Sequence, residues 1–192
     1  MESSPFKDLP QGTLFYVLIV AGIIGAIFLF VFILYLKNLQ DLLKNVREPN
    51  RKMAPAMVWL LLVNLLSLFL AIPELTGNTL PAWGTTAITI AEYAVMVFAL
   101  VFTFYMVNKI SESVAAELAS RNMSAEGKPT YGIGMFMCAC NTLALVAGLP
   151  YLSGIGTVAS IAGFVAWIMY WVKTNEYKIK LQSLPANDQF DF

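Results

Sequence analysis

The chain has 192 residues, of which 58% are hydrophobic and 12% are charged, against the roughly 25% charged residues of a soluble domain. Its formal net charge is zero and it has no Lys/Arg-rich arm, which argues against binding to nucleic acid. It contains no histidine, which excludes His-ligated haem, HExxH zinc sites and Ser-His catalysis.

Long stretches with one charge or none account for the missing charge, and they are long enough to cross a bilayer, which takes about 20 apolar residues. The last run, 129–172, would make a single helix of about 65 Å, roughly twice the hydrocarbon thickness. We divide it at residues 148–154, whose glycines and proline are typical of a turn. Five spans are therefore predicted, at about 12–36, 54–75, 83–108, 130–149 and 153–172.

The basic residues predict how these spans are oriented. Apart from Lys7, all of them fall in three segments: Lys37, Lys44, Arg47, Arg51 and Lys52, then Lys109, Arg121 and Lys128, then Lys173, Lys178 and Lys180. Because basic loops stay in the cytoplasm, the N-terminus is expected outside and the C-terminus inside. A four-span arrangement, with the last run as a re-entrant pair, would put the final three lysines on the wrong side.

The predicted fold is an all-α, polytopic transmembrane helical bundle forming one domain over 1–183, with a disordered tail over 184–192. Spans 1, 3 and 5 are expected to continue into the cytosol as helices, since apolar residues keep a helical spacing beyond each of them. The third-span extension carries Ile110, Val114 and Leu118 and a Glu117–Arg121 pair at i,i+4, and Gly127 closes it. These stripes either pack on one another and the membrane surface or dock a partner.

Small residues predict the closest helix contacts, because helices in lipid associate where their backbones can approach. They occur in spans 1, 4 and 5, which are expected to pack most tightly: Ala21, Gly22, Gly25, Ala26, Gly132, Gly134, Ala139, Ala144, Gly156, Ala159, Ser160 and Gly163. Cys138 and Cys140 are two residues apart in a helix, about 200° around its axis. A disulfide or metal site there is not expected.

Glu92 is the candidate that most needs an explanation, since it lies about 5 Å from the predicted midplane. A carboxylate at that depth costs several kcal/mol unless it is neutral, paired or hydrated. Three roles fit: a neutral acid bonded to Asn64, Asn141 or Tyr93, a proton or cation site, or a contact with another subunit. If spans 2, 3 and 4 adjoin, Glu92, Asn64 and Asn141 would form an intramembrane polar seam.

A second candidate set lies near the cytoplasmic interface. Arg47, Arg51, Lys52 and Lys109 are expected to contact anionic lipid headgroups. No catalytic, cofactor or metal-binding signature is present, and the glycines lack the GKS/T sequence of a phosphate loop. An enzyme is therefore not expected.

The stretch NKISESVAAELASR (108–121), the following YGIG (131–134) and the closing YWVK (170–173) resemble small multi-span bacterial inner-membrane proteins without an assigned activity. This resemblance implies a plasma (inner) membrane location and transfers no functional residue. The function favoured from the sequence is a non-enzymatic subunit or scaffold that meets the lipid bilayer and other membrane subunits or further copies of itself. The alternatives are a small proton or cation transporter built on Glu92, and a protein that binds anionic lipid.

Overall fold

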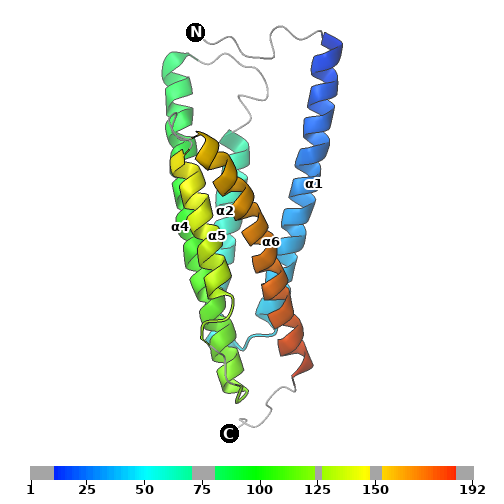
Figure 1. The fold of residues 1–192 in the computed structure, drawn as a ribbon, viewed down its shortest axis with the longest axis vertical. Coiled ribbons are helices and arrows are strands. Elements are labelled where there is room, and N and C mark those ends of the chain that lie inside the picture. The colour runs from blue at the N-terminus through cyan, green and yellow to red at the C-terminus, as the bar shows by residue number, and fades with distance from the viewer. Residues whose placement is uncertain (1–10, 71–80, 124–126, 148–152, 185–192) are drawn as a thin grey trace. The chain divides into compact units, whose positions relative to one another are not determined.

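The structure is a computed structural model that describes residues 11–70, 81–123, 127–147 and 153–184. Those residues are all-α, with no strand among them (Figure 1). The helices are α1 (Gln11–Lys44), the short 3-10 helix η1 (Glu48–Asn50), α2 (Ala54–Leu70), α4 (Ala82–Ser120), α5 (Tyr131–Ala147) and α6 (Ser153–Ser183). The predicted ends of spans 2 and 4 and the predicted tail after Leu184 fall outside the described residues.

Contacts divide the chain into two compact units, Met1–Leu39 and Gln40–Phe192. The first consists of most of α1. The second contains the last turn of α1 together with η1, α2, α4, α5 and α6. Within it, α2 packs on α4, α4 packs on α5, and α5 packs on α6, while η1 also contacts α4. Helix α4 is thus the element that most of the second unit is built around.

Three helices among the described residues are long and apolar enough to cross a membrane, in the segments Gly25–Lys44, Trp83–Ser120 and Gly154–Ser183. Each belongs to a helix that runs well past the predicted end of its span. Helix α4 has 39 residues, about 58 Å at 1.5 Å per residue, against roughly 30 Å of hydrocarbon. About half of α4 must therefore lie outside the apolar layer.

Apolar side chains are exposed in the first part of α4 and buried in the second, which is the pattern expected of a helix that leaves a membrane. Large apolar side chains at its start are exposed, including Trp83 (77%), Ile90 (65%) and Phe98 (59%). Beyond Tyr105 the apolar residues Met106, Val107, Ile110, Val114 and Leu118 are all buried. An exposed apolar surface of this extent is rare on a soluble monomer, whereas in lipid it carries no penalty.

Helix α4 ends at Ser120, so the prediction that Gly127 closes this helix is wrong. Asn122 adopts the left-handed conformation with φ 55°. This lets the amide of Asn122 donate to Ala119 O (3.1 Å) and that of Met123 donate to Leu118 O (3.0 Å), which satisfies carbonyls that a helix end leaves without a donor. Asparagine tolerates this conformation better than most residues, so Asn122 can terminate the helix at Ser120 without a glycine.

Helices α5 and α6 pack through small residues, as the sequence predicts for spans 4 and 5. A Cβ on Gly156 would meet Ala147 Cβ at 3.2 Å, and one on Gly134 would collide with Val107 of α4 and lie 2.9 Å from Tyr170 Cε2 of α6. The helix backbones lie close together here because the side chain of glycine is a single hydrogen atom. The small residues of α1 lie in the other unit, so their expected role stays a prediction.

We expect Gly134→Leu to destabilise the fold by about 1–3 kcal/mol, because the added side chain overpacks the junction of α4, α5 and α6. The control is Gly132→Leu, one half-turn earlier on α5, where an added Cβ meets nothing within 4 Å. The free energy of unfolding, measured by titrating detergent micelles with SDS, should fall for the first variant only. Equal losses would contradict the packing described here.

Candidate functional site

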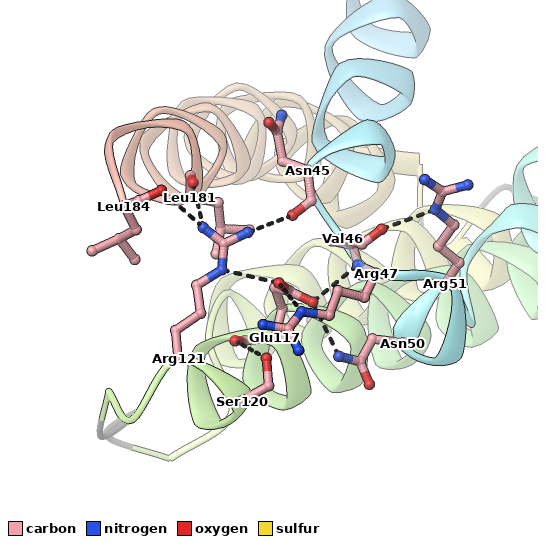
Figure 2. Close-up of polar contacts among 10 residues, drawn as sticks. All are labelled: Asn45, Val46, Arg47, Asn50, Arg51, Glu117, Ser120, Arg121, Leu181 and Leu184. Atoms are coloured by element: carbon pink, nitrogen blue, oxygen red, sulfur yellow. Dashed lines mark hydrogen bonds and ion pairs between the residues drawn. The ribbon is translucent and has the colours of Figure 1, made fainter. Parts of the chain in front are cut away.

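The most heavily bonded polar cluster lies at the end of the second unit where α1, α4 and α6 all terminate. Glu117, on the last turns of α4, has no exposed surface, and it is the one charged side chain among the described residues that is buried. Figure 2 shows it between the α1–α2 connection and Arg121. We call Glu117, Arg121, Arg47 and Asn50 the Glu117 cluster.

The carboxylate of Glu117 fixes the connection that follows α1. Its Oε2 accepts hydrogen bonds from the backbone N–H of Arg47 (2.9 Å) and from Asn50 Nδ2 (3.1 Å). Its Oε1 accepts from Arg121 Nε (2.9 Å) and lies 3.7 Å from Arg47 Nε. Two of these donors, on Arg47 and Asn50, lie 70 and 67 positions away in the sequence, so the carboxylate determines where this connection crosses α4.

Arg121 links the ends of two other helices to α4. Its Nη1 donates to Leu181 O (2.7 Å) and Leu184 O (3.3 Å) at the end of α6. Its Nη2 donates to Asn45 O (3.1 Å), directly after α1. These carbonyls belong to helix C-termini, which lack intrahelical donors and carry partial negative charge. Arg121 therefore caps α1 and α6 from a third helix (Figure 2).

The electrostatics of the Glu117 cluster depend on both arginines. Burial raises the pKa of the Glu117 carboxyl, because burial removes water from the charged form. Hydrogen bonds from the Arg47 amide, Asn50 and Arg121, together with the charge of Arg121, outweigh burial, and the pKa lies below its ordinary value. The carboxylate is consequently ionised and every strong donor around it is engaged, which suits a structural role rather than proton transfer.

A second group of contacts lies one to two turns earlier on α4. Ser113, fully buried, accepts a hydrogen bond from the backbone N–H of Lys52 (3.2 Å). Glu112 binds Lys109 Nζ (2.9 Å) and lies 3.9 Å from Lys52 Nζ. The α4 extension thus holds the residues that precede α2 as well as those that follow α1.

The candidate lipid contacts all have carboxylate neighbours in this structure. Arg47 lies beside Glu117, Lys52 and Lys109 lie beside Glu112, and Arg51 binds Glu48 at 3.2 Å. Their positive charge is therefore partly balanced within the chain. Lipid contact at these residues stays a prediction.

The residues of the predicted intramembrane seam are spread over three helices. Glu92 is partly exposed on α4, and Tyr93 beside it is exposed. Asn141 is exposed on α5, and the side chain of Asn64 on α2 lies outside the described part. No hydrogen bond or ion pair links Glu92, Tyr93 and Asn141 among the described residues, and the seam stays a prediction.

The position of Glu117 on the apolar face of its helix was a sequence signal for burial. The i,i+4 spacing of Glu117 and Arg121 does not convey this signal. Glu117 lies seven residues after Ile110 and three after Val114, so it occupies the apolar stripe itself. A charged residue on such a stripe is buried when the stripe is buried. Asn50, which donates to Glu117, and Leu181, which accepts from Arg121, are too distant in the sequence to be inferred.

No family of proteins, curated protein or solved structure matches this chain. Among the described residues no group of three or more Cys, Asp or Glu side chains is arranged to hold a metal ion. The functional argument therefore rests on the chain's own geometry.

We expect Glu117→Gln to lower the free energy of unfolding by about 3 kcal/mol, because it leaves a largely buried arginine without its carboxylate. The matched control is Glu48→Gln, which removes the exposed partner of Arg51 (Glu48 side chain 89% exposed) and should cost less than about 1 kcal/mol. The SDS titration measures both. If the two variants lose the same stability, Glu117 is not the buried anchor described here.

Acid should destabilise the wild-type chain through Glu117. Its pKa is lower in the folded state than in the unfolded chain, where a glutamate titrates at about 4.3, so below that pH the unfolded chain binds more protons. The contribution of Glu117 is present above the unfolded pKa and is lost as the pH falls through the folded pKa. Unfolding measured between pH 7 and pH 3 should show a steeper loss for wild type than for Glu117→Gln.

Proposed function

We propose that this chain is a multi-pass protein of the bacterial plasma (inner) membrane that acts as a non-enzymatic subunit or scaffold of a larger membrane assembly. It crosses the bilayer five times, with the N-terminus outside and the C-terminus in the cytoplasm. Helices α2 and α5, with 17 residues each, are about 26 Å long, which is at the short end of the range for a crossing helix.

The gathering of charge at one end supports this orientation. Basic residues from the α1–α2 connection, the end of α4 and the start of α5 meet there, through Arg121–Asn45, Lys52–Glu112 and Lys128–Asn108 contacts. Aromatic rings accompany them: Lys109 Nζ lies 5.5 Å from the Tyr105 ring and Lys128 Nζ 5.0 Å from the Tyr131 ring. Tyrosines beside lysines are typical of the membrane–water interface.

The position of the buried polar contacts is the observation that supports the scaffold role. They form the Glu117 cluster, which sets the relative positions of the α1 end, η1, α4 and the α6 end outside the apolar layer. A scaffold needs such a rigid surface at its docking end. Exposed groups at that end, such as Ile179 (55% exposed) between two lysines, offer a partner apolar contact flanked by charge.

A transporter remains the second candidate, on one specific observation. Glu92 lies in the apolar part of α4, in the predicted third span, and has no hydrogen-bond or ion-pair partner among the described residues. Ionisable groups at that depth are often functional.

We expect tags on the two ends of the chain to be accessible from opposite sides of the membrane. Native purification followed by mass spectrometry should recover a stoichiometric membrane partner with wild type and with Glu92→Gln. The same partner should be lost with Ile179→Asp, because the charge disrupts apolar contact without touching the Glu117 cluster. Retention with Ile179→Asp would remove this face as the docking surface. Proton- or cation-dependent flux in liposomes that Glu92→Gln abolishes would favour the transporter instead.

A further inference from the structure

Three lysines from three segments of the second unit gather around one carboxylate. Lys109 of α4 binds Glu112 at 2.9 Å, and Lys52, two residues before α2, has its Nζ 3.9 Å from the same carboxylate. Lys128, three residues before α5, donates to Asn108 Oδ1 at 3.4 Å. Asn108 Nδ2 in turn donates to Glu112 Oε1 at 2.8 Å. We call these five residues the Glu112 network.

The Glu112 network carries more positive charge than it balances internally. Three ammonium groups share one carboxylate, and the asparagine is neutral. Each ammonium has three N–H donors, whereas the described residues accept one hydrogen bond from Lys109 and one from Lys128. By contrast, Lys173 on α6 forms a one-to-one pair with Glu176 at 2.6 Å. The network therefore has a net positive charge and further donors to offer an anion.

The Glu112 network lies where the exposed apolar surface of α4 ends. Val101, Tyr105 and Lys109 follow one another at four-residue spacing and so share one face of the helix. Val101 is 58% exposed and Tyr105 is 43% exposed. The Tyr105 ring lies beside Lys109 Nζ and the Tyr131 ring beside Lys128 Nζ, as aromatic residues do at the headgroup level of a bilayer. The ammonium groups are thus level with phosphates rather than with acyl chains.

We propose that the Glu112 network binds the headgroup of one anionic phospholipid, whose phosphate pairs with Lys109 and Lys128. Lys52 adds its charge from the start of α2. The acyl chains of this lipid lie along the exposed face of α4 that includes Val101. The negative headgroup complements the net positive charge of the network, and lysines beside an anionic membrane surface attract such lipids.

The position of the network favours a lipid over a soluble anion. A soluble anion would match the charge and leave the exposed apolar face of α4 unused, whereas a phospholipid matches the charge and that face together. The site also differs from a general attraction between basic residues and lipid, because it requires Lys128 and does not require Lys173, which has its own carboxylate. No polypeptide partner is involved, so the proposal stands independently of the scaffold role.

The first test titrates the full chain in detergent micelles with phosphatidylglycerol or phosphatidylcholine and measures bound lipid by native mass spectrometry. We expect the wild-type chain to bind phosphatidylglycerol more tightly than phosphatidylcholine. Lys109→Gln and Lys128→Gln should each raise the dissociation constant for phosphatidylglycerol about five-fold, and the double variant about 20- to 30-fold, because each lysine attracts the anionic headgroup. Lys128→Arg keeps the charge and should retain binding.

Lys173→Gln is the matched control, because it removes the same charge at the end of another apolar span, and it should leave the dissociation constant nearly unchanged. Glu112→Gln should lower the constant, since it removes the negative charge of the network, and a variant that merely damaged the fold would not bind more tightly. Equal effects of Lys173→Gln and Lys128→Gln, or weaker binding by Glu112→Gln, would overturn the proposal. So would equally tight binding of inorganic phosphate, which would identify a site for soluble anions.

The second test leaves the Glu112 network intact and locates the lipid. The two buried cysteines are replaced by alanine, and a bimane fluorophore is attached to Val101→Cys, eight residues before Lys109. The control is Val165→Cys, eight residues before Lys173 on α6 and likewise exposed. In phosphatidylcholine vesicles, a small fraction of spin-labelled phosphatidylglycerol should quench the fluorophore at position 101 more than spin-labelled phosphatidylcholine does, and the two should quench equally at position 165. Equal quenching by both lipids at position 101 would overturn the proposal.

Discussion

The ion pair between Arg121 and Glu117 is the interaction on which the polar end of this protein depends. Three helices end at this place, and the carbonyls of each carry partial negative charge. A buried carboxylate in their midst would be unfavourable by itself. Arg121 reverses that balance because one planar guanidinium donates to Glu117, to the end of α6 and to the carbonyl after α1 at the same time.

The packing of the rest of the chain depends on which solvent surrounds it, lipid at the apolar part and water at the polar end. In the apolar layer large side chains point outward and the helices associate through glycine and alanine, as at Gly134 and Gly156. Beyond that layer the helices have water around them, and the usual arrangement returns, with an apolar core of Ile110, Val114 and Leu118 and charges outside it. Helix α4 passes through both, and its exposed residues change from apolar to polar on the way.

This division places the network of bonded charges at the polar end of the chain. The Glu117 cluster holds a surface at the polar end in one arrangement and leaves no reactive group free, which suits docking. The cluster therefore stabilises the single chain at its polar end.

The sequence by itself determined where the helices lie and which of them are apolar enough to lie in lipid. Uncharged runs of membrane length, helical spacing beyond residues 108 and 172, and small residues in spans 4 and 5 predicted α4, α6 and the α5–α6 contact, because periodicity and hydrophobicity are local properties. It placed the end of α4 wrongly, since a left-handed Asn122 closes that helix before Gly127. Only the tertiary structure decided which distant groups surround Glu117, whose i,i+4 spacing to Arg121 is equally typical of a surface pair. Its donors Arg47 and Asn50 are 70 and 67 residues away along the chain, and the carbonyls that Arg121 meets at Leu181 and Asn45 are 60 and 76 residues away. No local pattern encodes which distant groups will meet this ion pair once the helices pack.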